Sequence, residues 1–318
     1  MPDTVDQHID HRRLTQSARA PPPRRPRWLW SYRASLYLML APFLVGMLVL
    51  VVVPAALSFV LAFTEYDGLT TPEWRGLGNF QQLLGDQLFL TAARNSLLFV
   101  GLSVPARLIA ALGLALLLGR ARRGSSVYRA AVYLPTIVPS PAYALAWLWI
   151  FNPAYGPLNA LLGTLGLPTP AWLADTSTAL PAIVLMGLFQ IGEGLVVLLA
   201  GLQEIPRSYY DAADIDGAGA WARLRHITLP LLAPWLLLIT IRDIIVSAQS
   251  TFAPALLMTG GGPYYATLFV PLLMYQVAFD RLRFGEGAAM MLLVFLGVAA
   301  LIALAHLALG GWGYEDDV

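Results

Sequence analysis

Long uninterrupted stretches of hydrophobic residues dominate the chain, and short polar segments separate them. A helix of roughly 20 apolar residues crosses the hydrocarbon core of a bilayer. Six stretches reach this length, at residues 36–63, 96–119, 130–151, 179–202, 229–256 and 288–309. The pattern predicts an all-α, polytopic membrane bundle of six transmembrane helices.

One further apolar stretch, residues 267–279, is short for a crossing and contains Pro271. We expect it to be interfacial or partly re-entrant, and the sequence does not decide between the two. Prolines also lie within the predicted spans, where each removes a backbone donor and predicts a kink. These prolines include Pro42, Pro54, Pro105, Pro135, Pro139, Pro141 and Pro234.

Arginines are unevenly distributed over the segments that connect the predicted spans. Membrane proteins retain basic residues on the cytoplasmic side, so this distribution predicts orientation. The amino-terminal tail carries seven arginines, residues 120–129 carry four and residues 203–227 carry three, whereas the three opposite segments together carry four. The sequence therefore predicts that both termini and the 203–227 segment lie in the cytoplasm.

The same pattern divides the chain into three parts. Residues 1–34 are rich in Arg and Pro and bury too little apolar surface to fold alone, so we expect a disordered cytoplasmic tail. Residues 35–310 form the predicted transmembrane domain, and residues 311–318 a short cytoplasmic tail.

Composition narrows the chemistry that this chain can perform. Hydrophobic residues make up 58% of it and charged residues 12%, and the net charge of +1 gives no basis for nucleic-acid binding. There is no Cys and no Lys, which excludes disulfides, Schiff-base chemistry and the lysine of a Walker A loop. The four His show no metal-ligand spacing. We therefore expect no catalytic residue, metal or cofactor here, and any ATP hydrolysis must come from another chain.

A polar segment at residues 208–230, between the fourth and fifth predicted spans, has the pattern of two short surface helices. Ser208 is the expected N-cap, with Asp211 in the first turn of the helix. Gly217 suits a left-handed turn, a second helix is expected at about 220–226, and Pro230 suits the first turn of the fifth span. By itself, this pattern is also compatible with an ordinary amphipathic loop.

This segment resembles the cytoplasmic E-A-A signature of the membrane subunits of binding-protein-dependent ABC importers. In that signature E-A-A is followed by three residues, a glycine, nine residues and I-x-L-P. The matching positions are Asp211, Ala212, Ala213, Gly217, Ile227, Leu229 and Pro230. Asp211 replaces the glutamate, which keeps the charge but shortens the side chain by one methylene.

Two other stretches support the resemblance. Residues 128–163 are similar to the sugar-permease branch of the family, and "LLMTGGGP" at 256–263 resembles the T-x-GGP loop of that branch on the outer side. The likeness covers about residues 36–290. It fits the first of the two permease types, which is similar to the maltose, glycerol-phosphate and disaccharide permeases.

The resemblance implies an alternating-access importer in a bacterial or archaeal cytoplasmic membrane. Its partners would be a second permease, an ATPase dimer that holds ATP and Mg²⁺, an external solute-binding protein and a di- or oligosaccharide. Residues 209–217 would form the coupling helix that contacts the ATPase. Asp211 would contribute charge there and Gly217 the turn, while Tyr209, Tyr210 and Ala212 would supply apolar contact.

Four charged residues lie near the middle of predicted spans: Arg107, Glu193, Arg242 and Asp243. Each costs several kcal/mol there unless it is paired or hydrated. With Gln190 and Gln249 they either line a solute path or form ion pairs that hold helices together, and both readings remain open. Glu193 could pair with either arginine. Arg242 and Asp243 are neighbours and project about 100° apart on a helix.

Three alternative functions remain to be compared. An importer for a non-sugar solute such as glycerol phosphate would share the cytoplasmic signature. A secondary transporter would need repeated halves, and we see none. A membrane enzyme would need a nucleophile or metal cluster, which the sequence does not show. Which sugar is carried cannot be inferred from the sequence.

Overall fold

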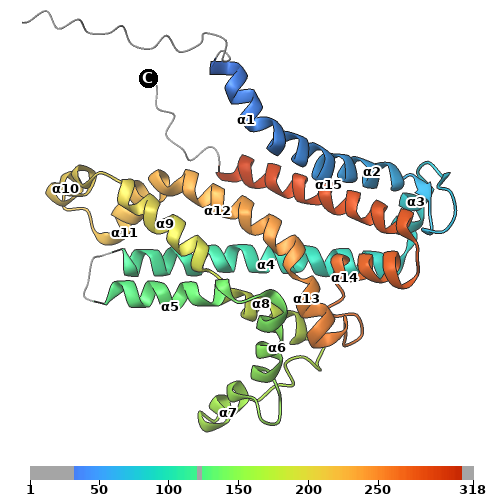
Figure 1. The fold of residues 1–318 in the computed structure, drawn as a ribbon. Coiled ribbons are helices and arrows are strands. Elements are labelled where there is room, and N and C mark those ends of the chain that lie inside the picture. Colours follow the sequence, from blue (N-terminus) through green and yellow to red (C-terminus); the bar gives the residue numbers. More distant parts are fainter. Residues whose placement is uncertain (1–31, 120–123, 310–318) are drawn as a thin grey trace, which may run out of the picture. The chain divides into compact units, whose positions relative to one another are not determined.

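The structure is a computed structural model that describes residues 32–119 and 124–309 (Figure 1). The predicted carboxy-terminal tail at 311–318 lies outside the described residues. So does the predicted amino-terminal tail at 1–34, except for its last three residues, because the first helix already begins at Tyr32.

The chain forms two compact units, residues 1–56 and 57–318. The described part of the first unit belongs to one apolar helix that continues to Leu61. It consists of α1 (Tyr32–Met47), the π-helical turn η2 (Leu48–Val52) and α2 (Val53–Leu61). None of its described side chains is buried, although nearly all are apolar. Such a surface is favourable in lipid and not in water.

The second unit is almost entirely helical, apart from a two-stranded antiparallel ladder that pairs Thr64 with Trp74 and Glu65 with Glu73. Its elements in chain order are β1 (Thr64–Glu65), β2 (Glu73–Trp74), α3 (Gly78–Gly85), α4 (Gln87–Leu118), α5 (Ser125–Ile137), α6 (Ser140–Ile150), α7 (Pro157–Thr164), α8 (Ala179–Leu188), α9 (Gly192–Glu204), α10 (Arg207–Ile215), α11 (Ala220–Arg223), η3 (Leu224–Thr228), α12 (Leu229–Ser250), α13 (Phe252–Pro254), η4 (Ala255–Thr259), α14 (Val270–Tyr275), η5 (Gln276–Asp280) and α15 (Phe284–Leu309).

Within the described residues, four helices are long and apolar enough to cross a membrane. They are Ser35–Leu61, Gln87–Leu118, Ala220–Thr259 and Phe284–Ala308. Two bent pairs raise this number to six if each pair makes one crossing, namely Ser126–Ile137 with Ser140–Ile150 and Ala179–Leu188 with Gly192–Glu204. The prediction of a helical, multi-span membrane protein is therefore confirmed.

The third predicted span, 130–151, is not one helix. α5 and α6 meet at an angle of 104°. Val138 and Pro139 have extended ψ angles of 128° and 137°, and Pro139 precedes the first turn of α6. A proline disfavours helical geometry in the residue before it, which explains why the helix stops here. By contrast, the helices continue through Pro105 and Pro234.

The fourth predicted span, 179–202, is also interrupted, although it contains no proline at the break. α8 and α9 are bent by 45° at residues 189–191. Gly192 starts α9 directly against the backbone of α5, where an added Cβ would lie 2.6 Å from the Cα of Tyr133. The close approach of these two helices therefore requires glycine.

Two π-helical turns precede prolines at the same spacing. Pro54 follows η2 and Pro230 follows η3, and in both cases the residue four positions before the proline lies inside the turn. A proline cannot bond that carbonyl and clashes with it in a regular helix. The wider turn accommodates the proline without ending the helix.

The core of the second unit is built around α4, which packs against α8, α9 and α12. Buried side chains such as Leu195, Leu198 and Leu232 fill the space between α9 and α12. The 267–279 stretch forms α14 and most of η5, which pack against α4 and α15. Val270, Leu272 and Leu273 are buried there, so this stretch lies within the bundle rather than along its surface.

Candidate functional site

The 207–228 segment forms a compact hairpin, which we call the knuckle. Its first helix, α10, ends in a Schellman turn, in which the amide of Ala218 donates to the carbonyl of Ala213 at 2.8 Å and that of Gly217 to Asp214 at 3.2 Å. Gly217 has a φ of +70°, in the left-handed region that favours glycine. The predicted turn at Gly217 is therefore confirmed.

Three details of the predicted knuckle were wrong. α10 begins at Arg207 after Pro206, so Ser208 lies inside the helix and is not its N-cap. For the same reason Asp211 lies beyond the first turn, which contains no acidic residue. The fixed φ of proline is well suited to the start of a helix. The second helix is not separate either, because α11 continues through η3 into α12 as one helix over Ala220–Thr259.

Side-chain contacts hold the two arms of the knuckle together. Arg223 forms an ion pair with Asp214 at 2.6 Å, and its Nε donates to the carbonyl of Ala218 at 2.8 Å. The hydroxyls of Tyr210 and Thr228 are hydrogen bonded at 3.0 Å. Sequence reasoning missed Asp214, Arg223 and Thr228, although an acid and an arginine nine residues apart across a predicted turn were a usable signal.

The structure divides the predicted coupling residues into two sets. Tyr210, Ala213 and Leu229 are buried or half-buried against the bundle. Ile227 and Pro230 are half-buried, in η3 and in the first turn of α12. The exposed set is Tyr209, Asp211, Ala212 and Gly217, together with Ile215 and Trp221, which the sequence analysis did not single out. Ile215 is 88% exposed and Trp221 70%, so the knuckle presents large apolar side chains beside its acids.

Arg107 of α4 lies in the interior of the bundle. Its Nε donates to the carbonyl of Gly187 at 3.1 Å, and one terminal nitrogen approaches the hydroxyl of Ser247 at 3.5 Å. Asp243 is buried on α12 and interacts electrostatically with Arg107. Because Gly187 lies against the guanidinium, a Cβ there would be 2.7 Å from its nitrogen. The contact between α4 and α8 depends on this glycine.

Arg242 connects the buried and exposed parts of the charged cluster. Its guanidinium donates to the carboxylate of its neighbour Asp243 at 2.7 Å and also pairs with Glu193 of α9. The side chains of Arg242 and Glu193 remain 36% and 46% exposed, whereas that of Asp243 is 7% exposed. Neighbouring residues on a helix project about 100° apart, but Arg242 and Asp243 still contact each other because the long arginine side chain turns back toward Asp243.

The break between α8 and α9 brings polar groups to the middle of a span. Gln190 is half-buried within the break, and Glu193 lies in the first turn of α9, where the helix dipole favours a negative charge. Interrupted helices form solute and ion sites in many transporters. Gln249 is exposed on α12, two turns from Arg242. The sequence signal that was missed is the glycine-rich run from Gly187 to Gly194.

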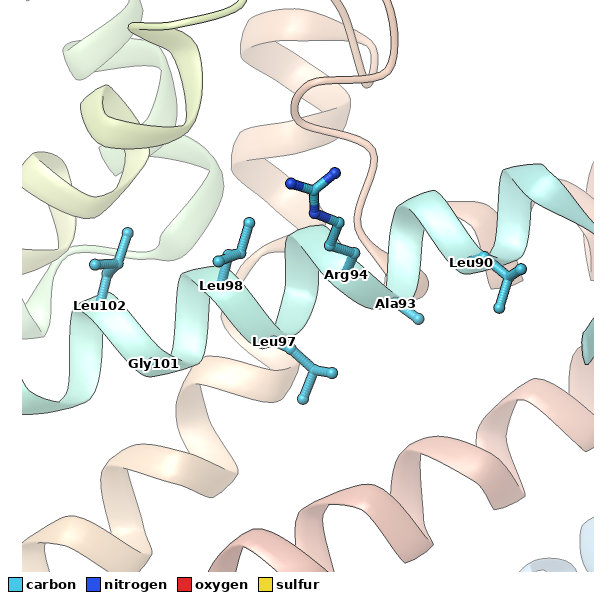
Figure 2. Close-up of a pocket in the computed structure, with 7 residues that line it drawn as sticks. All are labelled: Leu90, Ala93, Arg94, Leu97, Leu98, Gly101 and Leu102. Carbon is cyan, nitrogen blue, oxygen red and sulfur yellow. The ribbon is translucent and has the colours of Figure 1, made fainter.

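Two surface hollows lie outside this cluster. One follows a single face of α4 and has a volume of about 640 Å³ (Figure 2). It is lined by Leu90, Ala93, Arg94, Leu97, Leu98, Gly101 and Leu102. Arg94 is the only charged residue along it, so this apolar face has too few polar groups to bind a sugar. A second, polar hollow of about 250 Å³ lies near Arg75 and Glu286.

Metal ligands are not gathered anywhere in the described part of the chain. No group of three or more His, Asp or Glu side chains within residues 32–119 and 124–309 is arranged to hold a metal ion.

Comparison with known proteins identifies the family to which this architecture belongs. Residues 107–310 match the family described as "Binding-protein-dependent transport system inner membrane component". The probable ABC transporter permease protein YesP of Bacillus subtilis (strain 168) is 37% identical over 273 residues, which are 84% of this chain and 88% of that protein. The trehalose/maltose transport system permease protein MalF of Thermococcus litoralis is 34% identical, over 82% and 88% of the two chains.

A solved structure has the same fold. A chain of a bacterial ABC transporter involved in the import of the acidic polysaccharide alginate matches with a TM-score of 0.75 at 21% identity. The match covers 86% of this chain and 94% of that one. The chain is therefore a multi-pass membrane protein and belongs to the family of inner-membrane components of binding-protein-dependent transport systems.

Proposed function

We propose that this chain is the membrane subunit of an ATP-driven importer that takes up a di- or oligosaccharide in a bacterial or archaeal cytoplasmic membrane. It crosses the membrane six times with both termini in the cytoplasm, as the arginine distribution predicts. Relatives named for trehalose and maltose and for sulfoquinovosyl glycerol support a sugar. A relative named for sn-glycerol-3-phosphate makes that solute the alternative.

One observation carries the mechanism. The knuckle is continuous with a helix of 40 residues, and that helix also bears Arg242 and Asp243 of the charged cluster. A displacement of the knuckle is therefore passed along a rigid element to the middle of the membrane. Packed helices move between discrete arrangements rather than deforming smoothly, so such a displacement can open one side of the pathway and close the other.

The partners follow from what this chain lacks. We assign ATP and Mg²⁺ to a separate ATPase dimer, with no cofactor on this chain and no enzymatic role for it. The exposed residues Tyr209, Asp211 and Ala212 would contact the ATPase, together with Ile215 and Trp221. A second permease would complete the pathway, an external solute-binding protein would deliver the sugar, and lipid would surround the bundle. We assign no nucleic-acid partner.

The charged groups have different roles in this proposal. Arg107 is buried and links α4 to α8 and α12 through Gly187 and Ser247, and Asp243 is buried beside Arg242. Glu193, Arg242 and Gln249 are accessible and, with Gln190 at the helix break, would line the path of the solute.

The coupling role is tested with the complete complex in proteoliposomes. Gly217→Pro and Asp211→Arg should leave membrane insertion and assembly intact while uptake per ATP hydrolysed falls at least tenfold. Glu204→Arg makes the same change of charge at the end of α9, outside the knuckle, and should keep uptake within about twofold. Unchanged coupling in both knuckle variants would remove this role.

The pathway and the substrate are tested in the same vesicles. Glu193→Gln should lower sugar uptake at least fivefold without reducing the amount of assembled complex, whereas Glu204→Gln on the same helix should not. A panel of neutral disaccharides, oligosaccharides and glycerol phosphate separates the two solute classes. Transport of glycerol phosphate alone would favour the alternative.

A further inference from the structure

Two consecutive tyrosines stand out on the loop that follows η4. Tyr264 is 93% exposed and Tyr265 is 57% exposed. Their φ angles are +45° and +63°, in the left-handed region that bulky residues rarely adopt. Backbone strain of this kind is maintained only where the surrounding structure enforces it, and it concentrates at functional positions.

The rest of the loop is held firmly in place. The buried side chain of Asn95 on α4 donates to the carbonyls of Tyr265 at 2.7 Å and Leu268 at 3.1 Å. Ser96 accepts the amide of Val270 at 3.0 Å. A chain of hydroxyl contacts runs from Thr259 to Thr267 and on to the carbonyl of Gly262, with both distances 2.6 Å. The tyrosines therefore project from a rigid turn.

The loop lies at the opposite end of a transmembrane helix from the knuckle. The helix over Ala220–Thr259 has 40 residues and is about 60 Å long at a rise of 1.5 Å per residue. This length exceeds the full thickness of a bilayer. Figure 1 shows α10 and α11 at one end of α12 and α13 at the other. With a cytoplasmic knuckle, the two tyrosines face the outside.

The position of the loop favours a protein partner over lipid. Its stem is surrounded by other elements, since η4 packs against α6, and α14 against α4 and α15. Thr267, Leu268 and Phe269 in this stem are almost fully buried. The tip is thus attached to the interior of the outer end rather than to a lipid-facing helix. Exposed tyrosines on a rigid support are typical anchors of protein interfaces, because each combines a large apolar ring with a hydroxyl.

We propose that Tyr264 and Tyr265 form an aromatic anchor onto which the external solute-binding protein docks. This inference rests on the proposed import function, because that function supplies a soluble partner on the outer side. The preformed loop saves the cost of ordering its backbone when the partner binds. Docking here would act on the end of the helix whose other end is the knuckle.

The test uses the complete complex in nanodiscs and a purified solute-binding protein that stimulates ATP hydrolysis by the wild-type complex. Tyr264→Asn/Tyr265→Asn removes both rings but keeps residues that tolerate the left-handed region. We expect the Kd for the binding protein to rise at least tenfold, with unchanged ATP hydrolysis in its absence. Tyr264→Phe/Tyr265→Phe should keep the Kd within about threefold of the wild-type value. The control Tyr155→Asn changes a tyrosine that is 70% exposed in the loop between α6 and α7, and it should also keep the Kd within about threefold.

Each other outcome has a defined meaning. Unchanged affinity in the asparagine double variant would overturn the inference. Loss of assembly or of basal ATP hydrolysis would make the tyrosines structural, and loss from the membrane fraction would make them lipid anchors, and either result also overturns it. If no solute-binding protein stimulated or bound the wild-type complex, the import function itself would fail.

Discussion

The knuckle and the intramembrane charged cluster both depend on arginine contacts, but they are assembled over different distances in the chain. Asp214 and Arg223 pair within the knuckle, and Tyr210 meets Thr228 only 18 positions away. In the cluster, Arg107 contacts residues 80 and 140 positions away, and Arg242 contacts a residue 49 positions away. The knuckle is a local structure, whereas the cluster exists only in the folded bundle.

The charged side chains of the knuckle and of the cluster also differ in their exposure to solvent. The arginine of the knuckle is partly exposed and its acid more so, and exposed pairs of this kind contribute little to stability. Arg107 and Asp243 are almost completely buried, and removing the buried carboxylate would leave the arginines near it without compensation. We therefore expect changes in the cluster to affect folding and changes in the knuckle to affect coupling.

The largest expected effect comes from Asp243→Asn, which removes a charge at nearly constant shape. Arg242 would lose the carboxylate to which it donates at 2.7 Å, and the buried charge of Arg107 would lose a nearby opposite charge, so we expect about 3 kcal/mol of destabilisation. Glu193→Gln is the matched control, because it acts on the same Arg242 from a half-exposed position and should cost less than about 1 kcal/mol. Thermal unfolding of the purified complex and its monodisperse yield measure both.

The double variant Arg107→Leu/Asp243→Leu sharpens this result. It removes two buried charges of opposite sign together, which is often close to neutral, so it should recover part of the stability that Asp243→Asn loses. Equal losses for Asp243→Asn and Glu193→Gln would show that burial does not separate the two carboxylates.

A smaller effect is expected from Gly187→Ala. The added Cβ would lie 2.7 Å from a guanidinium nitrogen of Arg107, so the arginine must move away from the Gly187 carbonyl. We expect the free energy of unfolding to fall by about 1–3 kcal/mol, which is typical of overpacking. Gly101→Ala on α4 meets nothing within 4 Å and should be neutral or slightly stabilising. Similar unfolding midpoints for the two variants would contradict the predicted packing.

The knuckle provides a third and smaller effect. Gly217→Ala adds a side chain at a φ of +70° with open space around it, so only backbone strain opposes the change. We expect the variant to be destabilised by about 1 kcal/mol. Uptake per ATP hydrolysed should fall more clearly than the unfolding midpoint. Gly219→Ala, at a φ of −68°, lacks this strain and serves as the control. If both variants lowered coupling equally, the left-handed turn would not be the cause.

The smallest effect concerns Asp67, in a turn outside the predicted spans. Its carboxylate accepts the amides of Thr70 and Leu69 at 2.8 and 2.9 Å, and these hydrogen bonds lower the pKa of Asp67 to about 2. Since the pKa in the folded state is lower than in the unfolded chain, the stabilisation is present above about pH 4 and is lost as the pH falls through 2. The difference in unfolding midpoint between wild type and Asp67→Asn should therefore shrink between pH 5 and pH 2. A constant difference would contradict this assignment.

Hydropathy and local pattern by themselves determined much of this protein. A stretch of apolar residues must form a helix in lipid, because unpaired backbone groups are costly there. The four long apolar helices followed from this rule, whereas the breaks within the predicted spans 130–151 and 179–202 did not. The turn at Gly217 followed from the same local reasoning, since few other residues adopt a positive φ without strain.

Only the tertiary structure decided the features that join distant residues. It showed the break at 189–191, beside which Gly192 packs directly against the backbone of α5. It showed that Arg242 is the partner of Glu193 and that Arg107 lies against Gly187. It also revealed the left-handed backbone of Tyr264 and Tyr265, in a loop where Asn95 of α4 donates to the carbonyl of Tyr265. Pairing and strain depend on which helices pack together, and local sequence does not specify that choice.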